Sequence, residues 1–368
     1  MRFLVITNAP TLLQDSKHVA YDPYVREMNI WCKYVDEFTI VSPTTYNAEL
    51  LVSSFNKQPK VISVNGFSFT SFSNSIKSVL YIPQILFKVF RACKKTDHIH
   101  LRCPGNIGLL GCFVQILFPK KPKTAKYAGN WDPKAKQPLS YKLQKWILSN
   151  TFLTKNMQVL VYGQWEKQTK NIKPFFTASF YKNEIEDLKP KDYTKTLHMV
   201  FVGSLVEGKH PLFTIKLVEQ LIKQGKRICL NMYGNGVLKQ ELQDYIDYKN
   251  LKTSVFLHGN QTKEVIKTAL KQAHFSILPS KSEGWPKAIA EAMFFGVIPI
   301  ATKVSCVPYM LDYGKRGILI DLNLKTAIQL ILHYLASENL TEISDQAAQW
   351  SQQYTLDVFE ADIKTLLH

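Results

Sequence analysis

Several sequence signatures are missing from this chain, and each absence argues against a class of protein. No stretch reaches the roughly 20 apolar residues that a membrane-spanning helix needs, because the longest candidate, residues 107–118, is too short. The N-terminus has one arginine before a brief apolar run and no small-residue cleavage site. It therefore predicts a first β-strand rather than a signal peptide. The six cysteines form no CxxC pair, which favours core thiols in a reducing compartment over a metal site.

The short motifs of several nucleotide and metal enzymes are absent as well. The first strand is followed by Thr7-Asn8-Ala9-Pro10, without the glycines of a GxGxxG fingerprint. The P-loop pattern GxxxxGK[ST] does not occur, and neither does HExxH or Asp-x-Asp. We therefore expect no metal site, and no cofactor apart from the substrates.

Acidic residues are scarce in the first half of the chain. Residues 1–195 hold 28 Lys and Arg against 13 Asp and Glu, a net charge of +15 out of +17 for the whole chain. Residues 196–368 hold 18 against 16. This asymmetry indicates that the first half faces an anionic partner, such as a lipid surface, a phosphorylated substrate or a nucleic acid.

Short apolar strands alternate with helical patterns along most of the chain, which predicts parallel sheets with helices on both faces. The alternation stops at a polar, lysine-rich segment, residues 182–195, and restarts after it. We therefore expect an α/β protein with two Rossmann-like doubly wound domains, residues 1–181 and residues 196–345, that face each other across a cleft. Residues 182–195 would be the linker. Residues 346–368 would form a C-terminal helix that crosses back to the first domain.

One stretch of the second half, residues 276–301, combines several features of a ligand site. A short apolar strand ends at Pro279, a polar loop with Glu283 follows, and a helix is predicted from Pro286 with Glu291 inside it. The N-terminus of a helix after a glycine-containing loop attracts anions. Two carboxylates beside it would repel a bare phosphate but can accept hydrogen bonds from hydroxyls. The pattern therefore indicates a ligand that carries both a sugar and a phosphate.

Three more strand ends of the second half carry glycine. Gly203 follows one strand and has Lys209 six residues later, Gly234 follows the next strand, and Gly259 follows the third. Each turn alone is weak evidence, since glycines commonly close strands. Three successive turns at one sheet edge, with residues 276–301 as the fourth element, predict a pocket in which Lys209 neutralises a diphosphate.

These motifs resemble those of a known family. SEGWPKAIAEAM has the Glu-x7-Glu pattern of nucleotide-sugar glycosyltransferases with the GT-B fold, in particular retaining family four (glycosyl transferases group 1). FVGSLVEGKH, YGNG and LHGN match the family's diphosphate loop and intervening turns, so that the resemblance covers residues 196–322. DHIHLRCPGNIG and KYAGNWDP look like acceptor-side loops. The resemblance implies that the first domain binds the acceptor and the second binds the nucleotide-sugar donor.

The resemblance also implies roles for individual residues. Glu283 would contact hydroxyls of the transferred sugar, Glu291 the donor ribose, and Lys209 the diphosphate, helped by the backbone N–H groups of residues 284–287. The base would lie near Gly259 and Asn260. The candidate donor-binding residues are Gly203, Ser204, Lys209, Gly234, Gly259, Asn260, Glu283, Gly284, Trp285, Lys287 and Glu291.

The chain departs from the family pattern in two places. Ser204 stands where the diphosphate loop usually has an arginine, so that one cation is missing and Lys287 would partly replace it. The family often has a histidine in its acceptor loops, where this chain has Arg102 and Gly129-Asn130-Trp131, while His100 is expected to be a strand residue that faces the sheet. The candidate catalytic residues are Glu283, Arg102 and Asn130, with Glu283 in sugar binding and not as a nucleophile.

The expected function is therefore that of a metal-independent, retaining glycosyltransferase. It would move a hexose-type sugar from a nucleoside-diphosphate sugar, such as a UDP-sugar, to a glycan or lipid-diphosphate-linked acceptor in surface polysaccharide synthesis. The basic first half suggests a cytoplasmic enzyme that is peripheral on the inner face of the cell membrane. Residues 76–95 fit equally well an interfacial helix and an ordinary amphipathic helix packed on the sheet.

Two alternatives remain open at the level of sequence. Another enzyme of the same fold, such as a nucleotide-sugar epimerase or a phosphorylase, would share the donor site. A non-enzymatic nucleic-acid-binding protein would account for the basic half, although the chain shows no recognition-module motif and its basic residues are spread over many loops.

Overall fold

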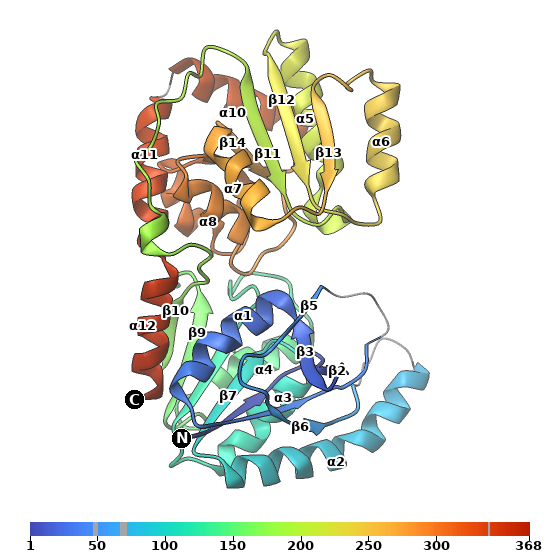
Figure 1. Ribbon diagram of the computed structural model, residues 1–368, viewed down its shortest axis with the longest axis vertical. Coiled ribbons are helices and arrows are strands. Elements are labelled where there is room, and N and C mark those ends of the chain that lie inside the picture. Colours follow the sequence, from blue (N-terminus) through green and yellow to red (C-terminus); the bar gives the residue numbers. More distant parts are fainter. Residues whose placement is uncertain (47–50, 67–71, 338) are drawn as a thin grey trace. The chain divides into compact units, whose positions relative to one another are not determined.

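The computed structural model describes residues 1–46, 51–66, 72–337 and 339–368 (Figure 1). The chain divides into two compact units. The first unit consists of Met1–Phe175 together with Glu360–His368, and the second consists of Phe176–Phe359. Each unit is built on a parallel sheet, which is the class expected from the alternation of strands and helices.

The first unit contains a seven-stranded sheet in the order β10-β9-β8-β7-β1-β4-β6, and all of its strand pairs are parallel. Its strands are β1 (Arg2–Ile6), β4 (Glu37–Ser42), β6 (Lys60–Ser63), β7 (His98–Cys103), β8 (Lys123–Tyr127), β9 (Met157–Tyr162) and β10 (Ile172–Phe175). The unit also has a small antiparallel sheet, β2 (Leu12–Gln14), β3 (Lys17–Tyr21) and β5 (Val52–Ser54). No pattern in the sequence predicts this second sheet, because its strands are too short to show a period.

Helices cover both faces of the large sheet of the first unit. They are α1 (Asp22–Trp31), α2 (Phe72–Lys95), α3 (Asn106–Val114) and α4 (Leu139–Ser149), with short 3₁₀ helices η1 (Cys32–Tyr34) and η2 (Gln115–Leu117). Side chains alternate between the two faces of a strand. Leu4 and Ile6 of β1 accordingly join the core formed with α2, α3 and α4, while Phe3 stacks on Trp31 of α1 at 5.7 Å between ring centroids.

The amphipathic segment at residues 76–95 lies within α2, which continues through Pro83. Ile85, Val89 and Cys93 are buried against the sheet. Phe87, between them in sequence, is 60% exposed. The helix is therefore packed on the sheet, and its outer surface still carries apolar side chains.

The second unit contains a six-stranded parallel sheet in the order β13-β12-β11-β14-β15-β16. Its strands are β11 (Leu197–Val202), β12 (Ile228–Tyr233), β13 (Val255–Gly259), β14 (Phe275–Leu278), β15 (Ile298–Thr302) and β16 (Ile318–Ile320). In order of appearance the strands are arranged 3-2-1-4-5-6, which is the order of dinucleotide-binding folds. Its helices are α5 (Pro211–Lys223), α6 (Lys239–Tyr248), α7 (Lys263–Gln272), α8 (Lys287–Phe294), α9 (Val307–Met310), α10 (Leu324–Ser337), α11 (Leu340–Ser351) and the start of α12 (Leu356–Leu367).

The structure differs from the expected boundaries in two places. The division falls after Phe175, and residues 182–195 belong to the second unit, where Glu184 pairs with Lys267 at 2.9 Å and Lys191 Nζ donates to the Gly296 carbonyl at 2.7 Å. A polar, lysine-rich composition therefore marks a surface segment here and not a free linker. Residues 346–368 form parts of two helices, α11 and α12, rather than one. Residues 360–368 group with the first unit, which agrees with the expected return to the first domain.

None of the helices in the described part of the chain is both long and apolar enough to cross a membrane.

Candidate functional site

The topology of the second unit marks one edge of its sheet as the place for a ligand. Strands β11 and β14 are neighbours, with Met199 opposite Phe275, although six helices and strands separate them in sequence. The strand order reverses between these two strands. Ligands of such sheets bind outside the carboxyl ends of the strands at this point. The loops that leave it are residues 203–210 after β11 and residues 279–286 after β14.

These two loops are joined to each other. The Lys281 N–H donates to the Gly208 carbonyl at 2.8 Å, and Lys209 Nζ forms an ion pair with a carboxylate oxygen of Glu283. The Lys209 side chain is 28% exposed and that of Glu283 is 9% exposed. The predicted diphosphate residue and the predicted sugar residue, 74 positions apart in sequence, therefore come together at the edge of the sheet.

The glycine turn after β12, residues 234–236, packs against the loop after β11, residues 203–210. A Cβ at Gly234, where φ is +135°, would lie 2.0 Å from the Gly203 carbonyl oxygen, and one at Gly236 would lie 2.4 Å from that of Leu205. The Leu205 N–H donates to the Asn235 carbonyl at 3.0 Å. Glycine is required here because the two backbones touch. This backbone contact gives Gly234 a structural role. That Gly234 also contacts a donor remains a prediction.

The third turn carries an aromatic platform that the sequence analysis missed. The ring of His258 stacks on Tyr233 at 4.7 Å and 15°, and its Nε2 lies 2.7 Å from Asn231 Oδ1. Gly259 follows with φ +68° and accepts a hydrogen bond from the Gly234 N–H at 2.8 Å. Asn260 is exposed beside it. The signal in the sequence was an aromatic residue, Tyr233, at the end of one strand and His258 near the end of the next. Such a pair could have suggested stacked rings next to the predicted base position.

Glu291 lies in α8, eight residues after Glu283. The Ser179 hydroxyl donates to its Oε1 at 2.5 Å. Burial raises the pKa of Glu291, while Ser179 and Lys287 act in the opposite direction. Lys287 is the first residue of α8, so that its ammonium group adds to the positive end of the helix dipole.

The side chain of Trp285 lies in an aromatic cluster and is 8% exposed. It stacks on Trp350 at 6.0 Å and meets Tyr354 edge to face at 5.6 Å. The next residue back, Gly284, accepts a hydrogen bond from Cys306 Sγ at 3.1 Å through its carbonyl. Trp285 therefore anchors the loop that carries Glu283, and this position offers a ligand mainly its backbone. Burial raises the pKa of Cys306 to about 12, so that its thiol stays protonated.

Ser280 is a further polar residue at the carboxyl end of β14. It is fully buried, and its Oγ has no hydrogen-bond partner within the described ranges. Its carbonyl accepts from Thr302 Oγ1 at 2.5 Å. The sequence shows only a serine after Pro279, a common loop pattern, and its position at the reversal of strand order depends on the tertiary structure.

Arg102, the candidate of the first unit, lies near the carboxyl end of β7 in a buried ion cluster. It pairs with Glu27 of α1, and the second carboxylate oxygen of Glu27 accepts from Lys126 Nζ at 2.8 Å. Burial raises the pKa of Glu27, but the two cations outweigh this effect and lower it well below the usual range. The cluster was not expected from sequence, where Glu27 lies in an ordinary amphipathic pattern.

Asn130 lies in the loop after β8, where its Oδ1 accepts from the Asp132 N–H at 2.9 Å. Its neighbour Trp131 packs edge to face on Tyr127 at 4.9 Å. His100 is fully buried in β7, with Nδ1 2.8 Å from Thr124 Oγ1, so that it faces the sheet as expected. Burial lowers the pKa of His100 well below its ordinary value. The roles of Arg102 and Asn130 in catalysis stay predictions.

No three His, Cys, Asp or Glu side chains in the described parts of the chain are grouped so that they could hold a metal ion.

The second unit also matches a known family. The model of the family "Glycosyl transferases group 1" matches residues 182–353. Residues 182–353 are a group 1 glycosyl transferase domain. The match spans the loops that carry Gly203, Lys209, Glu283 and Glu291, and it confirms the resemblance for this part of the chain.

Curated relatives match the chain over limited segments. WcaL of Salmonella typhimurium, provisionally named a colanic acid biosynthesis glycosyltransferase, is 29% identical over 133 residues, which are 34% of this chain and 33% of the relative. A poly(ribitol-phosphate) alpha-N-acetylglucosaminyltransferase of Staphylococcus aureus is 25% identical over 133 residues, 36% of this chain and 27% of the relative. The chain thus spans about a third of the length of the curated relatives it matches.

Solved structures cover the whole chain. Alr3699/HepE of Anabaena in complex with UDP has a TM-score of 0.69 at 14% identity, over 100% of this chain and 99% of that one. Sucrose-phosphate synthase of Thermosynechococcus elongatus has a TM-score of 0.67 at 15% identity, over 100% and 98%. At this identity the likeness concerns the fold. It confirms the predicted class, two Rossmann-like parallel-sheet domains of the GT-B type, of which the group 1 domain is the second.

Proposed function

We propose that this protein is a glycosyltransferase that moves a hexose-type sugar from a nucleoside-diphosphate sugar to a glycan or lipid-linked acceptor. The observation that carries the proposal is the meeting of Lys209 and Glu283 at the carboxyl ends of β11 and β14, directly before the N-terminus of α8. This edge offers a cation, a carboxylate and the N-terminus of α8, whose first N–H groups have no partner within the helix, in one group 1 domain. A ligand with a diphosphate and sugar hydroxyls would use all three.

In the proposed reaction the bond between the sugar's anomeric carbon and the β-phosphate oxygen breaks, and a bond to the acceptor oxygen forms. Lys209, Lys287 and the N-terminus of α8 stabilise the negative charge that develops on the departing diphosphate. The departing phosphate takes the proton of the acceptor hydroxyl on the same face of the sugar, so that the configuration is retained. Glu283 holds sugar hydroxyls and is not a nucleophile. The reaction as proposed uses no metal ion.

The nucleotide is proposed to be a uridine diphosphate. This choice is supported by the neighbours of similar fold, since HepE was solved with UDP and TarM of S. aureus with UDP and α-GlcNAc-glycerol. In the proposed site the base lies over the Tyr233–His258 ring pair near Asn260. Glu291, held by Ser179, accepts hydrogen bonds from the ribose.

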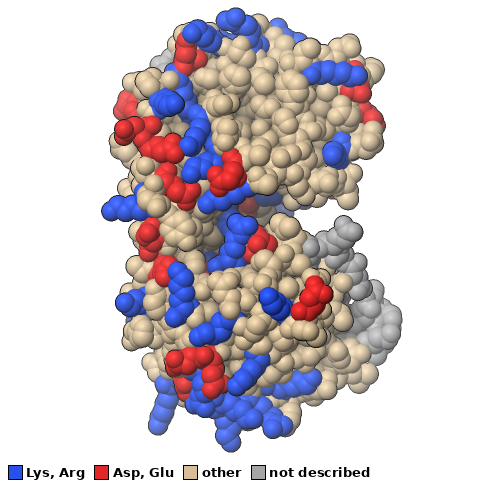
Figure 2. Space-filling model, viewed as in Figure 1, with Lys and Arg blue, Asp and Glu red and all other residues tan. Residues whose placement is uncertain are grey.

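Surface polysaccharide synthesis is proposed as the setting because WcaL is named for colanic acid, and AmsK of Erwinia amylovora, 29% identical over 127 residues, for amylovoran. We further propose that the enzyme is cytoplasmic and peripheral on an anionic membrane. Figure 2 shows Lys and Arg side chains gathered at the lower end of the first unit. The outer surface of α2 adds exposed Leu80 and Phe87 beside Lys88 and Arg91.

A donor panel tests the proposal. Thermal unfolding is followed with UDP-, GDP- and CMP-sugars, because a ligand that binds the native state raises the unfolding temperature. We expect UDP-sugars to stabilise the protein and Glu283→Ala to abolish transfer while UDP still binds. Stabilisation by CMP-sugars alone contradicts the proposal.

Product analysis separates the alternatives. An epimerase changes the donor in the absence of an acceptor, and a phosphorylase requires phosphate as the attacking group, whereas a transferase releases nucleoside diphosphate in proportion to the glycan formed. Nucleic-acid binding that survives Glu283→Ala, with no transfer in the wild type, favours the binding-protein alternative.

A further inference from the structure

A cavity of about 660 Å³ opens at the amino ends of β7, β8, β9 and β10 in the first unit. This edge is the opposite one from the carboxyl ends of β7 and β8, where Arg102 and Asn130 lie. The residues that line the cavity are His98, Pro119, Lys120, Pro122, Lys123, Thr151, Thr154, Lys155, Asn156, Met157, Gln158, Lys170, Asn171 and Leu366. A volume of this size is typical of sites for small organic ligands.

The charges of this cavity all have one sign. Lys120, Lys123, Lys155 and Lys170 line it, and no aspartate or glutamate does. None of the four forms an ion pair with another described residue, in contrast to Lys60, which pairs with Glu37 at 3.0 Å in the same unit. Ammonium groups that share one cavity repel one another, so that an anion between them lowers their energy.

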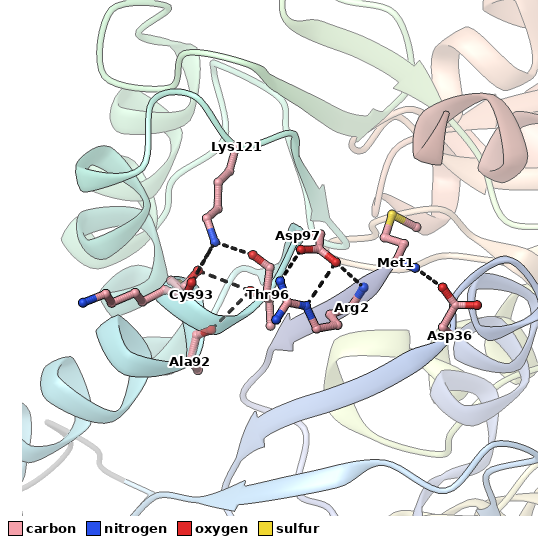
Figure 3. A network of polar contacts seen from close by, with 9 residues as sticks. Met1, Arg2, Asp36, Ala92, Cys93, Thr96, Asp97 and Lys121 are labelled. Atoms are coloured by element: carbon pink, nitrogen blue, oxygen red, sulfur yellow. Dashed lines mark hydrogen bonds and ion pairs between the residues drawn. The ribbon is translucent and has the colours of Figure 1, made fainter.

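Lys121, a neighbour of the cavity lysines, has a structural role instead. Lys121 donates from Nζ to the carbonyls of Cys93, Lys94 and Thr96 at the end of α2 (Figure 3). It caps a helix C-terminus and does not line the cavity. Lys120, the preceding residue, does line the cavity.

Lys123 forms a fixed part of the cavity wall. It is 2% exposed, and its Nζ donates to the carbonyls of Gln115 at 3.2 Å and Phe118 at 3.1 Å. Lys120, Lys155 and Lys170 are exposed and can move toward a ligand. The cavity thus combines one anchored cation with three adjustable ones.

Hydrogen bonds to backbone carbonyls hold two of the polar side chains around these lysines. Asn171 Nδ2 donates to the Leu148 carbonyl at 2.8 Å, and Asn156 Nδ2 donates to that of Pro119 at 3.0 Å. His98 is 1% exposed and lies with Nε2 3.0 Å from Thr124 Oγ1, while its Nδ1 has no partner among the residues described. The Nδ1 atom of His98 could therefore form a hydrogen bond with a ligand in the cavity.

We propose that this cavity binds a phosphate group, carried by a phosphorylated small molecule or by a phospholipid headgroup. Lysine ammonium groups bind phosphate as point charges, and the cavity has room for the organic group attached to it. Phe152, 75% exposed, lies beside the cavity lining with Lys155 Nζ 5.1 Å from its ring centroid, an arrangement that suits a headgroup with its acyl chains alongside. The site is separate from the donor site, and the inference goes beyond the proposed function.

The test compares two triple variants that lose the same charge. One is Lys120→Gln/Lys155→Gln/Lys170→Gln, and the control replaces exposed lysines outside the cavity, Lys17→Gln/Lys94→Gln/Lys142→Gln. Both carry Lys209→Met, which weakens binding of pyrophosphate at the proposed donor site and leaves that site identical in the two variants. Inorganic pyrophosphate and vesicles of phosphatidylglycerol or phosphatidylcholine are the probes, and protection of lysines from acetylation is read by mass spectrometry in the Lys209→Met parent.

We expect protection of Lys120, Lys155 and Lys170 in the parent, and binding that weakens by roughly fivefold for each cavity lysine removed at low salt. The control should bind like the parent. Protection by pyrophosphate supports a free phosphorylated ligand, and protection by phosphatidylglycerol vesicles alone supports a headgroup. No protection by any probe, equal protection by both kinds of vesicle, or equal weakening in the two triple variants overturns the inference. None of these readouts depends on donor binding or transfer, so that they do not bear on the proposed function.

Discussion

The two sheets of this protein share a strand order but differ at their carboxyl edges. In the first unit β6, β4, β1, β7, β8 and β9 follow the order 3-2-1-4-5-6, as do the strands of the second unit. The second edge consists of glycine turns and the ion pair of Lys209 with Glu283. The first has glycines after β7, β8 and β9 but none after β1, and it buries Arg102 and Lys126 around Glu27.

We infer from this difference that strand order selects where a ligand can bind, while the loops decide which ligand it is. A glycine-rich edge exposes backbone N–H groups, which suit a diphosphate. At the first edge the cations already share a carboxylate, so that their charges are balanced without a ligand. This edge offers a ligand side chains rather than backbone N–H groups. The predictions below test whether the two edges divide the tasks in this way, in order of decreasing expected effect.

The largest effect is expected at the buried cluster of the first unit. Glu27→Gln leaves Arg102 and Lys126 side by side without their carboxylate, and removal of one partner of a buried ion pair typically costs about 3–5 kcal/mol. Urea denaturation followed by tryptophan fluorescence should show this loss of unfolding free energy.

The matched control is Glu37→Gln, which breaks the exposed pair with Lys60 and should cost no more than about 1 kcal/mol. If both variants lose the same stability, Glu27 is not the electrostatic centre of the first unit.

The second prediction concerns the edge of the second unit. Lys209→Met should lower kcat/KM roughly 100- to 1,000-fold, which is the typical loss when one group that stabilises transition-state charge is removed. Its unfolding free energy should change far less than that of Glu27→Gln, because the Lys209 side chain is 28% exposed. Steady-state kinetics with the donor found in the panel measure the effect.

Lys325→Met serves as the control, since Lys325 is exposed on α10 of the same unit. A Lys209→Met enzyme as active as this control would show that the diphosphate is held elsewhere.

The third prediction concerns the backbone contact between two glycine turns. In Gly234→Ala the new Cβ would lie 2.0 Å from the Gly203 carbonyl oxygen, at a residue with positive φ. We expect a loss of about 1–3 kcal/mol and weaker donor binding, both measured by thermal unfolding with and without nucleotide. Gly208→Ala, in the adjoining loop with nothing within 4 Å of the added Cβ, should behave like the wild type. Equal tolerance of both substitutions would mean that the first loop can move away from the second.

Apart from these effects at a fixed pH, a pH dependence of stability is expected from two buried lysines. Burial lowers the pKa of Lys191 in the second unit to about 7 and that of Lys123 in the first to about 8. The unfolded chain keeps these protons up to about pH 10.4. Each lysine therefore makes stability rise with pH, from about 7 or about 8 respectively up to about 10.

Lys191→Met and Lys123→Met should each lose that rise, with the later onset for Lys123. The measurement is the difference in unfolding free energy between wild type and variant at several pH values. A difference that stays constant between pH 7 and pH 10 contradicts the assignment.

Sequence reasoning placed the residues at the carboxyl edge of the second sheet more fully than those at the carboxyl edge of the first. Residues 276–301 contain their own strand, loop and helix signals, so that Glu283 and Glu291 could be placed before the structure was known. The sequence places Arg102 at the carboxyl end of a strand, where the structure also has it. Its partner Glu27, however, lies 75 residues away in a helix with no unusual pattern. No local signal could connect them.

The misassigned linker and C-terminal helix have similar causes. Residues 182–195 are polar because they lie on the surface of the second unit, and composition does not distinguish such a segment from a free linker. The break between α11 and α12 falls at residues 352–355, where neither glycine nor proline marks the end of a helix.

The sequence by itself determined the alternation of strands and helices, the glycine turns, the pair of carboxylates eight residues apart and the excess of positive charge in the first half. These properties depend on neighbours within a few residues, which the chain order already contains. The tertiary structure alone decided that Lys209 meets Glu283, that Glu27 joins Arg102 to Lys126, and that four lysines line one cavity at the amino ends of the first sheet. These contacts join residues far apart in sequence, and only the packing of helices on parallel sheets brings their charges within reach of one another.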